Sequence, residues 1–383
     1  MPIHNWMSGL KGTRKLVELC LPGSHDAGVY RDQNAGVNPG ASARCQYSNI
    51  WQQAMHGSRV FDIRCFLRTK GVFKKKKTPT MGHFFKEGKD GYLGEYGGTL
   101  FSALEDAATF LTVYPTEFLI FRIGHTKCTG NVAEALQQFR KRTDPITHKM
   151  PYASVIHRGA TGNLADLQVW QLRGKLLLVF DQEFNSPNFS TDDGYYPYCK
   201  YPSTAQTGLT FCGKYSGAVG TSLALQSKNK GNWSSEGSAK ITNAACEEHQ
   251  KHGGSDHLLW VYWQETGGDV LKNTTATQGM HARLDKFLSD IRDPKNNLPQ
   301  PNVIGHDFVN ATTCRKIVKM NRDDNNARST LGSSRQSLTY TLEFLQSEAF
   351  RIQVEDYVPF VFSQPVEARS SFRQQNRERT SSC

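Results

Sequence analysis

Two titratable side chains stand next to each other in a turn near the start of the chain. The stretch "LPGSHDAG", residues 21–28, places His25 and Asp26 directly after the apolar run "KLVELCL" of residues 15–21. An imidazole titrates near neutral pH and can act as a general base or a general acid. Whether this pair does chemistry depends on what stands at the ends of the other apolar runs.

Further polar residues occur on or after those runs. In "FDIRC", Asp62 and Arg64 are two residues apart, so in a strand their side chains share one face. The short run "TMGHFF" exposes His83, and "VIGHD" ends in His306 and Asp307, which alternate to opposite faces. The sequence thus offers two or more imidazoles, a guanidinium and several carboxylates at strand ends.

Such a set is suited to phosphodiester chemistry. Two imidazoles can serve as base and acid within one turnover, and an arginine neutralises the charge of a developing phosphorane. Taken singly, His25 is typical of a loop histidine, and Asp62 with Arg64 of a structural ion pair. Their joint occurrence favours catalysis by attack of a neighbouring hydroxyl, which needs no metal. Glu117, at the start of its run, is expected to be structural.

The elements that must position these residues alternate between strands and helices. Short runs rich in β-formers occur at 15–21, 59–66, 117–124, 175–181, 257–264 and 302–309, and amphipathic helices are predicted at 99–115, 131–142 and 278–293. This alternation predicts an α/β fold of parallel strands joined by crossovers, with polar groups at the carboxyl ends of the strands. Residues 183–256 are polar and predict a short strand with an excursion that faces substrate.

The end of the chain differs from the rest. We expect a barrel domain at 1–320, a linker at 321–337, and a small β-rich appendage with a disordered tail at 338–383. The whole has a net charge of +11, with local excess in "RTKGVFKKKK" (68–77) and "RQQNRERTSS" (373–382). This balance fits an anionic partner, either a phospholipid surface or nucleic acid.

Composition excludes several classes of protein. Hydrophobic residues make up 38% of the chain, which is typical of a globular protein, and no window approaches the roughly 18 apolar residues of a membrane span. We expect no conventional signal peptide, so a cytoplasmic location and export by another route both stay open. Nine scattered cysteines without a CxxC pair argue against a zinc site and a full disulfide framework, and favour mostly reduced thiols.

The motifs "LPGSHDAG", "FDIRC", "GHFF" and "VIGHDFV", in this order, resemble the X-domain of phosphatidylinositol-specific phospholipase C in its bacterial form. The likeness covers roughly residues 10–320. It implies a distorted TIM-type barrel that cleaves phosphatidylinositol, or a related inositol phospholipid, to diacylglycerol and a cyclic inositol phosphate. By this resemblance His25 is the general base, Asp307 orients it, Arg64 stabilises the phosphate, His83 protonates the leaving oxygen, and Asp26 assists.

The resemblance also bears on metal and substrate. Eukaryotic members bind calcium through an asparagine and acidic residues, whereas here Asp26 follows His25 and the cation Arg64 takes the place of an acid. We therefore predict an enzyme without metal or other cofactor. Bacterial members hold the inositol hydroxyls at the ends of middle strands, and the residues here that we expect to contact substrate are Asp62, His125, Tyr262 and Gln264.

The sequence also allows other hypotheses about function. The enzyme could act on another phosphodiester, or the chain could be a catalytically silent module that binds anionic lipids. Nucleic-acid binding rests on net charge alone, without a recognised motif, so we predict no nucleic-acid partner. We expect a monomer that contacts anionic membrane surfaces peripherally.

Overall fold

The structure of the chain is a computed structural model that describes residues 1–30, 33–34, 44–70, 76–88, 91–124, 129–142, 152–180, 190–199, 209–212, 258–263, 281, 284–296 and 300–321. The chain divides into two compact units, residues 1–321 and 322–383. The second unit lies outside the described residues. The predicted linker, appendage and tail therefore stay predictions.

In the described residues, eight parallel strands form a closed ring. Each strand pairs with the next in the order β1, β3, β6, β7, β8, β9, β10, β11, and β11 pairs back to β1. Their bounds are β1 Leu21–Ser24, β3 Val60–Lys70, β6 Leu119–Gly124, β7 Leu176–Phe180, β8 Tyr195–Cys199, β9 Leu209–Cys212, β10 Leu258–Tyr262 and β11 Val303–His306. The predicted barrel of TIM type is confirmed.

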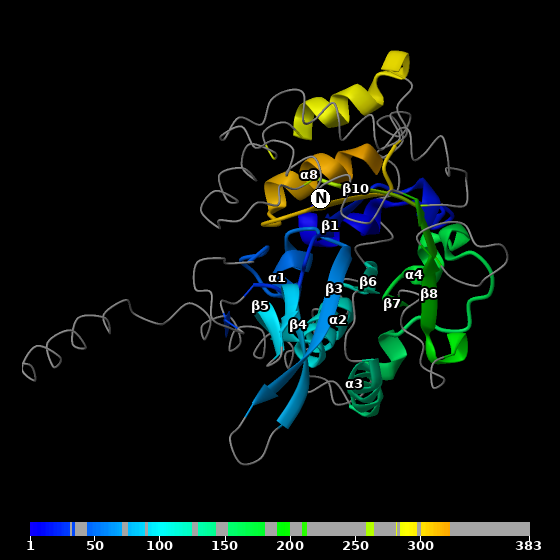
Figure 1. Cartoon of the computed structure of the whole chain (residues 1–383). Helices are drawn as coiled ribbons and strands as arrows, with labels where there is room; N and C mark the ends of the chain where they lie inside the picture. Colours follow the sequence, from blue (N-terminus) through cyan, green and yellow to red (C-terminus); the bar gives the residue numbers. More distant parts are fainter. Residues whose placement is uncertain are drawn as a thin grey trace, which may run out of the picture. The chain divides into compact units, whose positions relative to one another are not determined.

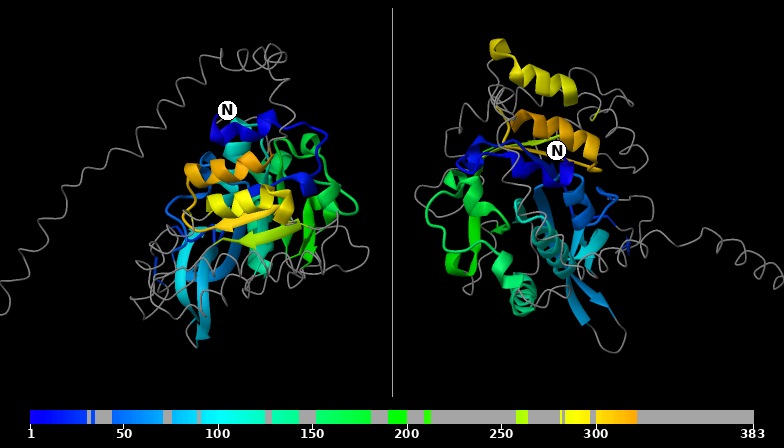
Figure 2. Two further views of the ribbon diagram at one scale, coloured as in Figure 1. Left: turned by 90° about the horizontal axis from the view of Figure 1, so that it is seen from above. Right: turned by 180° about the vertical axis from the view of Figure 1, so that it is seen from behind.

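Helices and 3-10 turns connect these strands (Figures 1 and 2). The α-helices are α1 Ile50–Met55, α2 Leu100–Val113, α3 Thr129–Lys141, α4 Val169–Leu172 and α8 Ala311–Val318, and residues 284–292 are also helical. The 3-10 turns are η1 Ile3–Gly9, η2 Leu16–Glu18, η3 Tyr152–Val155, η4 Leu164–Asp166, η5 Thr191–Asp193, η6 Pro294–Asn296 and η7 Lys319–Asn321. The helices predicted at 99–115, 131–142 and 278–293 all appear.

Two predictions about strands need correction. The first strand is not at 15–21: that run forms η2, and β1 begins at Leu21. Leu16 and Leu19 are both fully buried, and their spacing of three residues is that of a 3-10 turn rather than a strand. Residues 183–256 supply two strands, β8 and β9, where one was predicted.

Three apolar clusters hold this barrel. One fills its interior and floor, with Val60, Ile120, Val179, Trp260 and Val303 among its members. A second lies outside the ring, between β3, β6, β7 and the helices α1, α2 and α3. The third packs α8 and residues 284–292 onto the outer faces of β10 and β11 (Figure 2).

An antiparallel arm extends β3 beyond the ring. β3 pairs with β4 (Lys76–Gly88), β4 with β5 (Gly91–Thr99), and β5 with the short β2 (Gln33–Asn34). Figure 1 shows β3 and β4 projecting together from the barrel as a ribbon. The basic stretch of residues 68–77 thus joins β3 to β4, although residues 71–75, which include Lys74 and Lys75 of "KKKK", lie outside the described part.

Within the described residues, no helix combines the length and the apolar character that spanning a membrane requires.

Candidate active site

His25 and Asp307 come from neighbouring strands at the carboxyl end of the ring. β1 and β11 run parallel with Ser24 opposite His306, so the residues that follow each strand meet. His25 Nδ1 lies 2.8 Å from Asp307 Oδ1, and both side chains are buried. The predicted partnership of these two residues is present in the geometry.

Arg64 fixes the proton position on His25. Arg64 Nη2 lies 3.0 Å from His25 Nε2, and a guanidinium can only donate hydrogen bonds. In this contact Nε2 accepts, so Nδ1 carries the proton and donates it to Asp307. A neutral imidazole held in this tautomer has the form that a general base requires.

Asp26 sits at the centre of the charged groups. Its backbone φ of 41° is in the left-handed region, which turns the chain sharply after His25. Asp26 Oδ1 lies 2.6 Å from Arg64 Nε, and Oδ2 is paired with His83 Nδ1. One carboxylate therefore links the guanidinium to the second histidine.

His83 reaches this site on the arm and not from a barrel strand. It lies on β4 opposite Glu95 of β5, between two register shifts at Thr80/Gly82 and Phe84/Lys86. Such irregularities re-aim the side chains beside them. The histidine predicted at a strand end is thus in the middle of a long antiparallel strand.

Glycines bring the arm onto the loop after β1. Gly98 donates its N–H to the carbonyl of Gly28 at 3.0 Å. A Cβ atom on Gly97 would collide with that carbonyl, and one on Gly28 would collide with Met81 of β4. The glycines of "SHDAG" and "YGGT" therefore allow the approach that places His83 against Asp26.

Asp62 and Arg64 share one face of β3, as predicted. Asp62 is fully buried, and its oxygens lie 2.8 Å from Arg64 Nη2 and 2.7 Å from Arg122 Nη1. Arg122, on the adjacent β6, also lies over the ring of Trp260. Asp62 thus anchors the guanidinium of Arg64 from the barrel interior and forms a second ion pair with Arg122.

The network shifts the pKa values of its members in consistent directions. Burial lowers the pKa of His25, but the charges of Asp26 and Asp307 and the hydrogen bond to Asp307 outweigh it, so the net pKa is raised. Burial alone would raise the pKa of Asp26 and of Asp62, but Arg64 and the other nearby cations hold both below their usual range. His25 is therefore a strengthened base facing ionised carboxylates.

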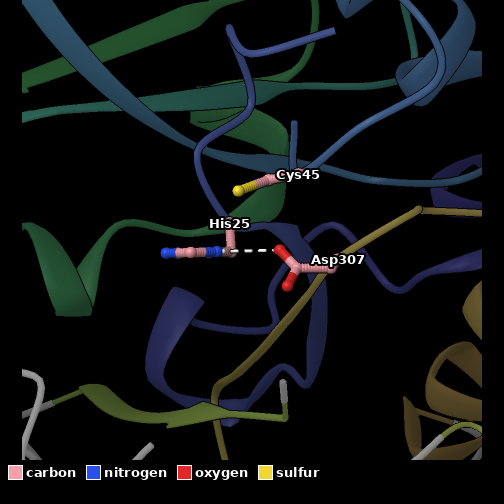
Figure 3. Close-up of side chains that lie close together, drawn as sticks. All are labelled: His25, Cys45 and Asp307. Atoms are coloured by element: carbon pink, nitrogen blue, oxygen red, sulfur yellow. Dashed lines mark hydrogen bonds and ion pairs between the residues drawn. The ribbon is translucent and has the colours of Figure 1, made fainter. Parts of the chain in front are cut away.

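Residues 44–49 contribute two side chains that the sequence analysis did not single out. Gln46 is fully buried and donates to the carbonyls of His25 (2.8 Å) and His306 (3.2 Å), while its oxygen accepts from Val309 N–H at 2.9 Å. Cys45 places its sulfur beside His25 and Asp307 (Figure 3). No motif in the sequence marks either residue, because their partners are distant along the chain.

Three of the predicted substrate contacts stay predictions. His125 and Gln264 lie outside the described residues, and Tyr262 is described only as the last residue of β10. Trp263 is buried against Phe287 in the outer core, at 4.5 Å between ring centroids. His306 is buried; its ring lies against His281, and its Nδ1 is 3.2 Å from the backbone carbonyl oxygen of Asp307.

Comparison with known proteins supports the fold. The phosphatidylinositol-specific phospholipase C from Listeria monocytogenes matches with a TM-score of 0.52 and 16% identity, covering 84% of this chain and all of that one. A pentafluorophenylalanine-containing form of the Staphylococcus aureus enzyme matches with a TM-score of 0.53 and 16% identity, covering 84% and 98%. No family model and no curated protein matches the sequence. At this identity, the predicted family is supported by fold similarity alone.

Proposed function

We propose that this chain is a phosphodiesterase that cleaves phosphatidylinositol, or a related inositol phospholipid, to diacylglycerol and a cyclic inositol phosphate. The observation that carries the proposal is the convergence of His25 and His83 on Asp26, with Arg64 between them. The fold shared with two bacterial phospholipases supports it. Asp307 completes the catalytic set.

His25 acts as the base in this proposal. Its Nε2 takes the proton of the inositol 2-hydroxyl, whose oxygen attacks the phosphorus and forms the cyclic ester. Asp307, 2.8 Å from Nδ1, stabilises the imidazolium that results. The contact of Arg64 with Nε2 has to open first, and a substrate phosphate provides the anion that draws the guanidinium away.

Arg64 then neutralises the phosphorane. Its side chain is 18% exposed, while the carboxylates that hold it are fully buried, so it presents its charge toward the open side of the site. A fixed cation in a partly dehydrated site stabilises the transition state more than one in water.

His83 supplies the proton for the leaving group. Its ring is 28% exposed, and its Nδ1 is held by Asp26, which orients the other nitrogen for donation. As the bond from phosphorus to the diacylglycerol oxygen breaks, that oxygen takes the proton of His83. Base and acid are separate residues. After one turnover, His25 has therefore gained a proton and His83 has lost one.

The residues present do not fit a catalytic calcium ion. His25, Asp26 and Asp62 offer donor atoms within 4.8 Å of one another. Arg64 is paired with both carboxylates, however, and calcium requires six to eight oxygen ligands. We therefore propose that the catalytic step uses no metal and no other cofactor.

Substrate contacts are proposed at the open side of the site. Asp62 belongs to them through Arg64, which it holds, and His125, Tyr262 and Gln264 are proposed for the inositol hydroxyls. The basic hairpin of residues 68–77 is proposed to contact an anionic membrane surface. We propose a monomer without a nucleic-acid partner.

The test is phosphorus NMR of the purified full chain with phosphatidylinositol vesicles in EDTA. We expect a cyclic inositol phosphate signal from the wild type and from His56→Ala, a control histidine outside the network, and none from His25→Ala or His83→Ala. Folded wild-type protein without a phosphorus product would overturn the proposed substrate. A panel of glycerophosphodiesters and sugar phosphodiesters, run in parallel, would then identify another substrate, and product from none of them would indicate a lipid-binding module.

A further inference from the structure

We propose that Asp26, Cys45 and His83 form a binding site for a soft divalent cation of the zinc class, and that the bound ion blocks this active site. The three residues come from the loop after β1, from residues 44–49 and from the arm. Their ligand atoms lie within 4.8 Å of one another. The blocking step rests on the proposed function, whereas the binding step does not.

The geometry is close to that of a zinc site. Zinc bonds of about 2.0–2.3 Å in a tetrahedron separate ligand atoms by about 3.3–3.6 Å. Cys45 Sγ lies 3.7 Å from Asp26 Oδ2, the same oxygen that meets His83 Nδ1. His83 lies closer to Asp26 than two ligands of one ion do, so a small outward movement of His83 makes room for the ion.

The donor set selects the metal. Sulfur, nitrogen and oxygen donors together suit zinc, whereas calcium and magnesium prefer oxygen alone. Arg64 occupies the other oxygen of Asp26, at 2.6 Å, which leaves Oδ2 for the ion. A thiolate and a carboxylate balance the two charges of the cation.

A competing set, His25, Cys45 and Asp307, also lies within 4.8 Å, and Figure 3 shows the sulfur beside that pair. An ion there would need the Nδ1 lone pair of His25. That nitrogen carries a proton, because Nε2 accepts from Arg64. His83 is 28% exposed, so water can solvate a proton moved to its Nε2. The arm histidine is therefore the ligand.

An ion bound at this site would block catalysis by binding two of the proposed catalytic groups at once. The ion would hold His83, the proposed acid, and would neutralise Asp26, which pairs with Arg64. The predicted consequence is an enzyme that needs no metal for turnover and is inhibited by zinc but not by calcium or magnesium. A chelator would restore its activity.

Direct binding tests the site independently of catalysis. Zinc alone is titrated into the full-length wild type, Cys45→Ala and Cys65→Ala in competition with a chromophoric chelator. Cys65 is a matched control, since it lies on β3 in the outer core. We expect one site of the wild type to be retained in Cys65→Ala and weakened at least about tenfold in Cys45→Ala, as loss of a thiolate ligand predicts. Equal affinity and stoichiometry in all three proteins would overturn the proposal.

Spectroscopy on the wild type covers the case in which a variant does not fold. X-ray absorption at the zinc edge, with one equivalent bound, should show a single sulfur neighbour and lighter atoms for the remainder. A first shell without sulfur would overturn the site. Inhibition is measured as the ratio of turnover with and without zinc for each folded variant, and zinc binding without any phosphodiesterase activity would refute the proposed function while leaving the site established.

Discussion

Two clusters of arginine and carboxylate lie at opposite ends of the part of β3 that pairs with β6, residues 60–64. Directly before β3, Arg59 pairs with Glu117 at 2.9 Å through Nε, and both side chains are fully buried. Arg59 also donates to the carbonyls of His4, Ala54 and Ser58. Glu117 accepts the N–H of Met7.

At the far end of this paired part, Arg64 has the same chemistry and different neighbours. Its partners are Asp26, Asp62 and His25, of which the histidine titrates near neutral pH, and its side chain is 18% exposed. Arg59 bonds to fixed backbone carbonyls, whereas Arg64 bonds to groups that can exchange protons or partners.

The difference separates a stabilising role from the proposed catalytic role. A buried charge that is surrounded by fixed acceptors has no second arrangement, so it only holds the structure together. A charge that is shared among titratable groups beside solvent can be redistributed when a ligand arrives. The two clusters therefore predict opposite responses to mutation.

The largest effect is expected from His25→Ala at the catalytic end. Removing the proposed base should lower turnover of phosphatidylinositol by about 10²–10⁴-fold. Thermal unfolding should change little in comparison. Steady-state kinetics together with calorimetry tests this prediction. A His25→Ala variant that loses stability but keeps its turnover would show that the cluster around Arg64 is structural as well.

In the cluster around Arg59, Glu117→Gln should lower stability and leave turnover unchanged. It leaves the charge of Arg59 buried without a counter-ion, which costs about 3–5 kcal/mol in the free energy of unfolding. Turnover per folded molecule, measured well below the melting temperature, should match the wild type. Urea unfolding gives the free energy; a loss under 1 kcal/mol would count against the distinction between the two ends.

Asp307→Asn sharpens the comparison through pH. The charge of Asp307 helps to raise the pKa of His25, so its removal lowers that pKa. Because the proposed mechanism needs neutral His25, the acid limb of the pH profile should move to lower pH, and turnover should fall by about 10²-fold as the orienting partner weakens. A loss of turnover with an unmoved acid limb would indicate that Asp307 does not act on the proton of His25.

The arm is tested by Gly97→Ala. The added methyl group collides with the carbonyl of Gly28 and should push β5 and β4 away from the loop that carries Asp26. Displacement of the acid by about 1 Å should cost about 10–10² in turnover. The barrel itself should remain folded by circular dichroism, and full activity in this variant would mean that His83 does not need its observed position.

The effect that is smallest near neutral pH concerns the dependence of stability on pH. Burial, and then the neighbouring His281, lower the pKa of His306 from 6.5 to about 3. Between about pH 6.5 and 3, His306 therefore binds a proton in the unfolded chain but not in the native chain. The free energy of unfolding falls as the pH drops through this range, by up to about 1.4 kcal/mol per pH unit. His306→Gln should flatten this decline, as measured by denaturant unfolding at several pH values. An unchanged slope would assign the acid sensitivity to other groups.

Much of the barrel could be predicted because most of its strands are short apolar runs with longer, helix-compatible stretches between them. The helix α2 was predicted as well, from its periodic leucines and from Pro115 after its end. The prediction of a strand at 15–21 was wrong because Leu16 and Leu19 pack into the apolar core from a 3-10 turn and not from a strand. Local pattern cannot tell which buried surface a residue faces.

The candidate site could be predicted in part for a related reason. His25, Arg64 and Asp307 stand at strand ends, where parallel topology brings them together. Gln46 and Cys45 lie in an irregular segment, and they join the site through contacts with residues more than 200 positions away. The approach of His83 depends on glycine contacts between the arm and the first loop, which no single stretch encodes.

The attachment of the arm has a consequence for how such an enzyme can diversify. The ring closes through β1 and β3 without help from β4 or β5, so the arm can be lengthened, shortened or exchanged while the barrel keeps its architecture. The residue proposed to protonate the departing alcohol is carried on that exchangeable piece, and the proposed nucleophile-activating residue is not. Recombination at the hairpin therefore offers a route to new leaving groups on an unaltered scaffold.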